Sequence, residues 1–187
     1  VYHLSHSLHL RSEGHVSLDG EERDCTEKGA AMLTALYRKE VNDYPKFFKM
    51  DPLCRLGFIA TELLLKAEGE TVEEARNDRA VVVCTRHGCY ANDCRYQQTI
   101  TDENYFPSPA VFVYTLANIV TGEIAIRHHY QGETSCFVVQ EYEAERVRQL
   151  AATAFCDHET KSVVCAWLDC RNEGEFEAVV ELMERNV

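Results

Sequence analysis

An apolar run at residues 80–85, with three consecutive valines, limits the possible folds of this chain more than any other segment. Charged residues precede the run and a glycine follows soon after it, as is typical of a strand buried on both faces of a sheet. Similar runs occupy residues 135–140 and 162–168, and helical patterns separate them. This alternation of strands and helices predicts an α/β layered fold with a mixed, mostly buried sheet.

The clearest helical pattern covers residues 51–69. Asp51 is a capping residue, Pro52 suits the first helical position, and apolar residues recur at helical spacing up to Gly69. We expect all elements to belong to one domain that spans residues 1–187, because a chain of this length buries roughly 70% of its surface on folding. The other predicted elements are a strand or hairpin at 2–18 broken at Gly14, a helix at 26–41 with Thr26 as its N-cap, a loop at 87–104, helices at 111–127 and 141–155, and a strand or helix at 175–186.

The charge of the chain argues against two classes of partner. The formal net charge is −12, with 19 basic and 31 acidic residues, whereas phosphate recognition needs clustered lysine and arginine. The same sign disfavours docking to an anionic membrane surface, and no apolar run approaches the ~20 residues of a membrane span. The first ten residues mix His and Ser with apolar residues and lack the apolar core of a secretory signal. We therefore expect a cytoplasmic protein that binds neither nucleic acid nor membranes.

The cysteines and histidines do not predict a metal site or a bound cofactor. Nine cysteines are present, an odd number, and most lie in apolar segments, so we expect reduced thiols that fill the core. The spacing of Cys84, Cys89 and Cys94 around His87 is poor geometry for structural zinc. The other histidines are expected to point apart on a strand, at His3, His6 and His9, or to form a solvated helix end, at His128 and His129.

An aromatic and basic patch stands out on the acidic chain. It comprises Lys46, Phe47, Phe48 and Lys49. One interpretation is a loop whose rings pack beneath the helix at 51–69, since aromatic residues mostly serve burial. The other is a docking surface for an acidic partner.

A longer motif runs from residue 108 to residue 132. The motif begins with a proline and several apolar residues, which lead to Leu116-Ala117-Asn118. An apolar pair, a small residue and a glycine follow, then Ile126-Arg127 and finally Gly132. The order and spacing resemble the stretch of β-ketoacyl synthases that precedes their active-site strand, in which a proline occupies the position of Ala117. The resemblance implies a thiolase-like fold, and it implies that this chain corresponds to the N-terminal half of a ketosynthase, without the second half that carries the histidine pair.

In that family the nucleophilic cysteine lies eight to ten residues after the glycine, at a strand-to-helix turn. Here the corresponding residues run from Gln140 to Glu143, with Glu141 and Tyr142 between them. Carboxylates suit the start of a helix, but they do not form a thioester. The nearest thiol, Cys136, lies at the start of the predicted strand and is expected to serve packing.

The resemblance therefore predicts a non-catalytic ketosynthase-like subunit, accessory or chain-length-factor-like, in type II fatty-acid, aryl-polyene or polyketide biosynthesis. Such a subunit would form a homodimer or a heterodimer with a full-length ketosynthase, would leave an apolar face to be covered, and would present the patch at residues 46–49 to an acyl carrier protein. Two alternatives stay open: a small acyl-processing enzyme that uses Glu141, Tyr142 or Cys136, and a structural or regulatory oligomer that kept only the fold.

Overall fold

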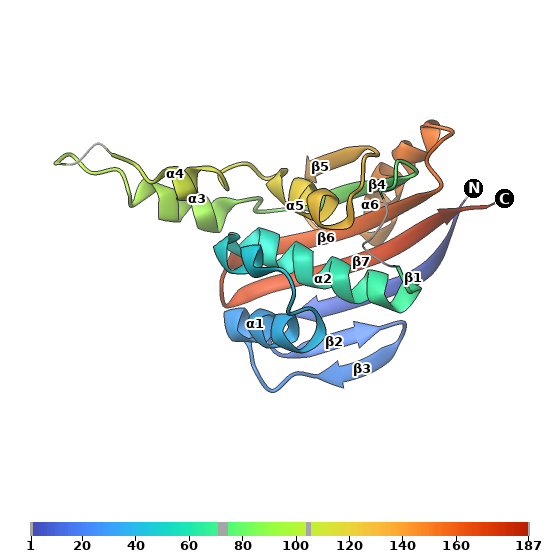
Figure 1. Cartoon of the computed structure of the whole chain (residues 1–187), viewed down its shortest axis with the longest axis horizontal. Helices are drawn as coiled ribbons and strands as arrows, with labels where there is room; N and C mark the ends of the chain where they lie inside the picture. Colours follow the sequence, from blue (N-terminus) through green and yellow to red (C-terminus); the bar gives the residue numbers. More distant parts are fainter. Residues whose placement is uncertain (1, 71–74, 104–105, 187) are drawn as a thin grey trace.

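The computed structural model describes residues 2–70, 75–103 and 106–186. These residues form one mixed sheet of seven strands in the order β3-β2-β1-β7-β6-β4-β5 (Figure 1). Strand β4 is parallel to its neighbours β5 and β6, and the other neighbouring pairs are antiparallel. The strands are β1 (Tyr2–Arg11), β2 (His15–Leu18), β3 (Glu21–Asp24), β4 (Arg79–Thr85), β5 (Thr134–Val138), β6 (Ser162–Asn172) and β7 (Glu175–Arg185).

Helices cover the two faces of this sheet unequally. Helices α1, α2 and α5 lie on one face, over most of its width, and α6 lies on the other face (Figure 1). Helix α6 packs mainly against β4 and β6, through residues such as Val147 and Ala151, and its Arg148 reaches Glu181 of β7. The helices are α1 (Gly29–Glu40), η1 (Pro45–Lys49, 3-10), α2 (Pro52–Glu68), α3 (Tyr90–Gln97), α4 (Pro109–Phe112), α5 (Ile119–His128), α6 (Ala144–Ala152) and η2 (Thr153–Cys156, 3-10).

The strongest sequence patterns are confirmed. Every residue of β4 is buried, because this strand lies between β5 and β6 with α5 on one face and α6 on the other. Helix α2 begins as predicted: the Asp51 carboxylate accepts a hydrogen bond from the backbone N–H of Cys54 at 2.9 Å, and Pro52 occupies the first turn. It ends at Gly69, whose φ of 83° is the left-handed conformation of a helix C-cap.

The amino-terminal pattern predicted a hairpin, and β1 and β2 form one. The chain turns at Gly14, where φ is 104° and an added Cβ would lie 2.5 Å from the backbone oxygen of Cys25. Strand β3 was not predicted, because all four of its residues are exposed and charged and so show no apolar alternation. The segment at 175–186 forms strand β7, which pairs with both β1 and β6.

Two helix predictions and one loop prediction were wrong in extent. The single helix expected at 111–127 is divided into α4 and α5, and between them the backbone makes i→i−3 turns while Thr115 donates its hydroxyl hydrogen to the backbone oxygen of Phe112 at 2.8 Å. Such local hydrogen bonds compete with the helical backbone pattern, and the β-branched residues of this stretch disfavour a continuous helix. Helix α1 begins at Gly29, not at Thr26, and the predicted loop at 87–104 contains helix α3.

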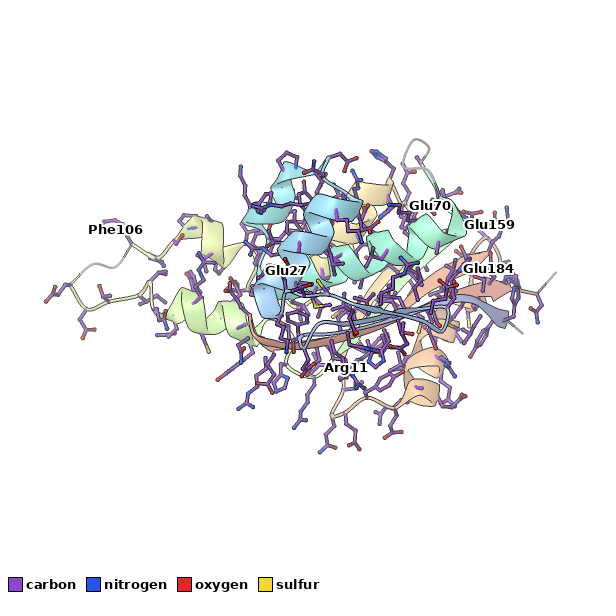
Figure 2. The ribbon with its side chains drawn as sticks, turned by 90° about the horizontal axis from the view of Figure 1, so that it is seen from below. Arg11, Glu27, Glu70, Phe106, Glu159 and Glu184 are labelled. Atoms are coloured by element: carbon purple, nitrogen blue, oxygen red, sulfur yellow. The ribbon has the colours of Figure 1, made fainter. Side chains whose placement is uncertain are left out.

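An uncovered apolar face was expected on the sheet or on a helix, and the open side of the described sheet is polar, whereas exposed apolar side chains such as Phe112 and Val113 lie at α4. Strand alternation places polar side chains on the face that α6 leaves open, and these pair with one another across the strands. His9 lies 3.0 Å from Glu177, which also accepts a hydrogen bond from Arg11 at 3.0 Å, and Figure 2 shows Arg11 on this open side. Helices long and apolar enough to cross a bilayer do not occur among the described residues.

The glycine of the long motif, Gly132, occupies a position where no larger residue fits. An added Cβ would lie 2.4 Å from the backbone oxygen of Arg79, at the start of β4. Since real Cβ contacts of that length are excluded, only glycine lets the chain enter β5 alongside β4. The motif therefore has a physical role at the start of these two parallel strands.

Candidate functional site

The turn between β5 and α6 contains the residues at the expected nucleophile position. Strand β5 ends at Val138 and α6 begins at Ala144, so Glu141 and Tyr142 lie at a strand-to-helix junction. Because β4, β5 and β6 are parallel, their carboxyl ends meet at one edge of the sheet. Ligands of open α/β sheets commonly bind at such an edge, which makes it the first place to look for a site.

Tyr142 packs against a neighbouring ring. Its ring centroid lies 5.6 Å from that of Trp167, a buried residue of β6, with an angle of 38° between the planes. Burial raises the pKa of Tyr142, and nearby Glu181 raises it further. The phenol is therefore neutral at physiological pH, and its role at this turn is an aromatic contact that fills space above the sheet.

Cys136 lacks the features of a reactive thiol. It lies in the middle of β5, its Sγ is 3.5 Å from the backbone oxygen of Ala117, and burial raises its pKa. Burial raises the pKa of Cys84 to about 11, and burial together with Asp93 raises that of Cys89 to about 12. A nucleophilic cysteine needs the opposite shift, which a helix N-terminus or a nearby cation would provide.

A histidine and a carboxylate meet at the same edge of the sheet, and sequence reasoning missed them. His87 Nδ1 lies 2.8 Å from Asp169 Oδ2, and Asp169 Oδ1 accepts the backbone N–H groups of Arg86 and His87 at 3.2 and 2.9 Å. The pair lines a cavity of about 350 Å³. A carboxylate that orients an imidazole in this way is the arrangement of a general base. The available signal was that His87 follows one predicted strand and that Asp169 comes directly after the apolar run of another, at 162–168.

The basic patch lines a second cavity, of about 440 Å³, between η1, the start of α2 and the α3–α4 segment. We call this cavity the basic groove. Apolar side chains, among them Phe48 and Val113, lie beside the charges. A concentration of positive charge on a chain with a net charge of −12 favours an acidic partner. The cationic residues of the groove are Lys46, Lys49, Arg55 and Arg95.

The two phenylalanines of the patch have different roles. Phe47 is fully buried, and its ring stacks on that of Tyr37 with centroids 4.4 Å apart. It therefore does not lie on the surface, as a docking role requires, because 3-10 helix η1 turns it under α2, where it meets Phe58. Phe48 is 48% exposed and lines the groove. The packing interpretation of the patch thus holds for Phe47, and the docking interpretation is open only to Phe48.

Lys46 is anchored by a buried carboxylate. Its Nζ lies 2.7 Å from Glu123 Oε2, and Tyr114 donates its hydroxyl hydrogen to Glu123 Oε1 at 3.0 Å. Burial lowers the pKa of Lys46, but the ion pair with Glu123 outweighs that effect and holds it above the usual value. Lys46 therefore supports the wall of the groove, whereas Lys49 and Arg95 are freer to meet a partner.

The histidine pair at 128–129 does not form a solvated helix end as expected. His129 is exposed in the left-handed conformation, but His128 is 4% exposed and lies 3.2 Å from both Glu62 and Glu70.

Five of the nine cysteines are buried, which agrees with their predicted packing role. Over residues 2–70, 75–103 and 106–186, groups of three or more His, Cys, Asp or Glu side chains arranged to hold a metal ion do not occur.

The comparisons with known proteins concern the fold. No family model matches the sequence, and no curated protein matches it. Among solved structures, the ishigamide ketosynthase/chain length factor superimposes with a TM-score of 0.70 over 98% of this chain, at 14% sequence identity. The chain has the thiolase-like ketosynthase fold.

Two further structures have the same fold. One is the ketosynthase ApeO in complex with its chain length factor ApeC from Xenorhabdus doucetiae, with a TM-score of 0.63, 14% identity and 100% of this chain covered. The other is a type II polyketide synthase acyl-carrier protein in complex with its ketosynthase, with a TM-score of 0.59 and 12% identity. This chain spans 62% of the matched chain in the first and third structures and 79% in the second.

Proposed function

We propose that this chain is a non-catalytic β-ketoacyl-ACP synthase-like subunit, comparable to a chain length factor, in type II fatty-acid, aryl-polyene or polyketide biosynthesis. One observation supports the proposal: the turn between β5 and α6, where the motif spacing of ketosynthases would place the nucleophilic cysteine, holds Glu141 and Tyr142. The nearest thiol, Cys136, has a raised pKa and lies within the strand. Condensation requires a thiolate at this turn, so a partner would have to supply it.

The edge of the sheet supports association with such a partner. Strand β5 pairs only with β4 among the described strands, which leaves the outer backbone groups of β5 unpaired. Val138, at its end, is 68% exposed. An edge strand of this kind is a template for pairing with another chain. We expect a heterodimer with a full-length ketosynthase through this edge, and a homodimer in its absence.

The segment that contains α3 and α4 supports the same proposal. It projects from the body of the sheet (Figure 1), and its tip carries Phe106, which is labelled in Figure 2 and is 84% exposed. A projecting segment with this much apolar surface is typical of a protein interface. Further exposed apolar residues of the segment and of the turn after it are Tyr90, Phe112, Val113 and Leu116.

The basic groove supports an acyl carrier protein as a second partner. Carrier proteins are acidic, and Lys49, Arg55 and Arg95 form a cationic surface beside the exposed ring of Phe48. Charges at the rim of an interface mainly raise the association rate and fix the orientation of the partner. The groove would thus receive the carrier protein while the catalytic partner holds the acyl chain.

The test is the intact mass of this protein after incubation with acyl carrier protein loaded with short and medium acyl groups, alone and with a partner ketosynthase. We expect no acyl adduct on this chain, acylation of the ketosynthase, and co-elution of the two proteins. A stable adduct on this chain would overturn the non-catalytic role and direct attention to Cys136, Glu141 and Tyr142.

One observation favours a second candidate, a small acyl-processing enzyme. The His87–Asp169 pair has the geometry of an oriented general base, with an Nδ1–Oδ2 distance of 2.8 Å, and it lies at the carboxyl edge of the sheet. Turnover of an acyl thioester that depends on His87 would support this candidate. If neither turnover nor binding to a ketosynthase or a carrier protein is detected, a structural or regulatory oligomer is the remaining function.

A further inference from the structure

The basic groove holds positive charge that the folded chain does not neutralise. Four cations line it, and one of them, Lys46, forms an ion pair, at 2.7 Å from a buried carboxylate. Lys49, Arg55 and Arg95 form no ion pair with any residue that the structure describes. Cations without a carboxylate partner that line a cavity are free to bind an anion there.

Two carboxylates lie at the groove, and they leave an excess of positive charge. Asp51 lines the groove, is 4% exposed, and accepts the backbone N–H of Cys54 at 2.9 Å, where it caps α2. Glu123 lies beneath the groove, is 5% exposed at its side chain, and is the partner of Lys46. Four cations therefore face two carboxylates, both of which already have a partner within the chain.

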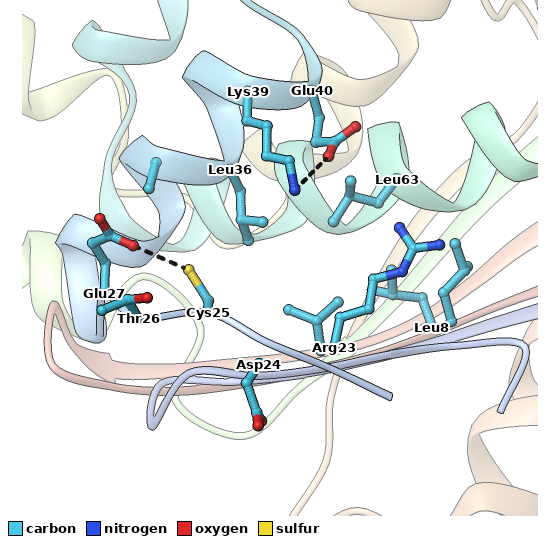
Figure 3. A pocket seen from close by; sticks show the side chains of 13 residues that line it. Leu8, Arg23, Asp24, Cys25, Thr26, Glu27, Leu36, Lys39, Glu40 and Leu63 are labelled. Carbon is cyan, nitrogen blue, oxygen red and sulfur yellow. Dashed lines mark hydrogen bonds and ion pairs between the residues drawn. The ribbon is translucent and has the colours of Figure 1, made fainter. Parts of the chain in front are cut away.

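The cavity of about 230 Å³ between strands β1–β3 and helices α1 and α2 has the opposite balance of charge (Figure 3). The carboxylates of Asp24, Glu27 and Glu40 line it, against the cations of Arg23 and Lys39. Figure 3 shows Lys39 paired with Glu40, at 3.6 Å. Because like charges repel, this cavity disfavours an anion, whereas the basic groove favours one.

Arg55 is held in place in the groove by the chain itself. Its Nη2 donates a hydrogen bond to the backbone oxygen of Phe48 at 2.9 Å, and its guanidinium carbon lies 5.8 Å from the centroid of the Phe47 ring. Its Nε is buried and has no hydrogen-bond partner among the described residues. A buried donor without a partner is uncommon and often marks the place of a bound ion or water. A fixed guanidinium presents its donors in a fork that matches the oxygens of a phosphate group.

Apolar side chains form another part of the groove wall. Phe48 is 48% exposed and Val113 is 56% exposed, and both line the groove together with Met50 and Val111. The groove has a volume of about 440 Å³. Since an apolar cavity of about 150 Å³ holds benzene, the groove has room for a ligand of about ten to fifteen heavy atoms, with a charged end and one small apolar body.

We propose that the basic groove binds a small free phosphate monoester, with its phosphate at Arg55, Lys49 and Arg95 and its apolar body against Phe48 and Val113. A phosphate monoester carries a charge of about −1.5 to −2 at pH 7 and offers three strong acceptor oxygens, which suits three unpaired cations. The inference goes beyond the proposed function, because it concerns a free ligand and requires no carrier protein. Either proposal can fail while the other holds.

The experiment is a ligand-observed NMR titration of the whole protein at pH 8 and low salt, without carrier protein. The probes are phenyl phosphate as the monoester, methyl phenyl phosphate as the singly charged diester, and benzyl alcohol as the uncharged body. We expect phenyl phosphate to bind at least about fivefold more tightly than the diester and at least about tenfold more tightly than benzyl alcohol, because the second negative charge and the third acceptor oxygen are used.

Two variants and a control assign the binding to the groove. Arg55→Gln removes the fixed guanidinium and should weaken binding of phenyl phosphate by at least about tenfold. Arg95→Gln, on the exposed surface of α3, should weaken it by about two- to fivefold and leave the fold intact. Arg146→Gln is the matched control, because Arg146 is also exposed and unpaired among the described residues but lies on α6, outside the groove.

Three results would overturn the proposal. The first is phenyl phosphate that binds no more tightly than benzyl alcohol or the diester. The second is equal binding of phenyl phosphate by Arg95→Gln, by a folded Arg55→Gln and by the Arg146→Gln control. The third is a phosphotyrosine peptide that binds at least about tenfold more tightly than phenyl phosphate, which would assign the groove to a phosphorylated protein instead of a free ligand.

Discussion

The imidazole Nδ1 of His87 lies 2.8 Å from the Oδ2 of Asp169, across the carboxyl ends of two adjacent parallel strands. The other carboxylate oxygen of Asp169 accepts two backbone N–H groups from the turn after β4. This arrangement has two consequences, one for stability and one for catalysis, and different experiments test them. The carboxylate stabilises the turn, and the imidazole is oriented as a proton acceptor beside a cavity.

The first prediction concerns catalysis at this pair. If the chain is a non-catalytic subunit, hydrolysis of acyl thioesters in its presence should equal the buffer rate, and His87→Ala should leave that rate unchanged. Release of free thiol, followed with a chromogenic disulfide, measures it. A rate above background that His87→Ala removes and that His87→Gln does not restore would establish the enzyme alternative.

The second prediction concerns the stability of the same turn. Asp169→Asn keeps the shape of the side chain but removes the charge from three hydrogen bonds, so it should lower the free energy of unfolding by about 1–3 kcal/mol. His87→Gln should cost less, about 1 kcal/mol or below, because its side chain is 29% exposed. Urea unfolding of the two variants measures the difference, and equal costs would contradict the central role given to Asp169.

The third prediction concerns the basic groove. Lys49→Glu combined with Arg95→Glu should weaken binding of an acyl carrier protein by at least about tenfold, because two attractive charges become repulsive. Lys161→Glu combined with Arg146→Glu makes the same change in net charge on exposed residues that do not line the groove, and serves as the matched control. Titration calorimetry at low salt measures the affinities. Equal affinities for the double variant and the control would mean that the basic groove does not bind the carrier protein.

The extent to which sequence predicted this fold depends on how each element is buried. Helix α2 and strand β4 were predicted because they lie in the interior, where periodicity and continuous apolar runs are strongest. Strand β3 has no buried face and helix α3 has one buried residue, Asn92, so neither carries an apolar pattern. The division between α4 and α5 lies in a run of i→i−3 backbone turns, which apolar periodicity does not reveal.

The candidate site was harder to predict than the fold. The turn that carries Glu141 and Tyr142 followed from motif spacing, since Gly132 fixes where β5 begins. The His87–Asp169 pair joins residues 82 positions apart, and only the parallel pairing of β4 and β6 brings them together. Phe47 was misplaced because composition does not tell which of two adjacent rings turns inward.

The fourth prediction tests how Lys46 supports the groove. Lys46→Met leaves the Glu123 carboxylate, 5% exposed at its side chain, without its cation and should lower the free energy of unfolding by about 1–3 kcal/mol. Glu123→Gln in the same chain should recover most of that loss, because the amide still accepts the hydrogen bond from Tyr114. A double-mutant cycle by urea unfolding measures the coupling. Strictly additive effects would show that the ion pair contributes nothing.

The last prediction follows from the buried position of His128 between Glu62 and Glu70, at 3.2 Å from each. Burial lowers the pKa of His128, but the hydrogen bonds to the two carboxylates outweigh burial and hold the pKa above its usual value. A group whose pKa is raised by folding stabilises the protein fully at pH values below its unfolded pKa, and this contribution disappears as the pH rises through the folded value. The partner carboxylates have lowered pKa values, chiefly because the hydrogen bonds from His128 overcome the effect of burial, and they stay ionised at pH 6.

His128→Gln should therefore lower the free energy of unfolding more at pH 6 than at pH 9, with a loss of about 1–3 kcal/mol at the lower pH. The measurement is urea unfolding of both proteins at several pH values between these limits. His158→Gln is the matched control, because His158 is exposed and its replacement should have the same small effect throughout. A loss for His128→Gln that does not change with pH would mean that the imidazole is neutral in the folded protein, and that Arg127, Arg79, Arg76 and Tyr130 hold the two carboxylates.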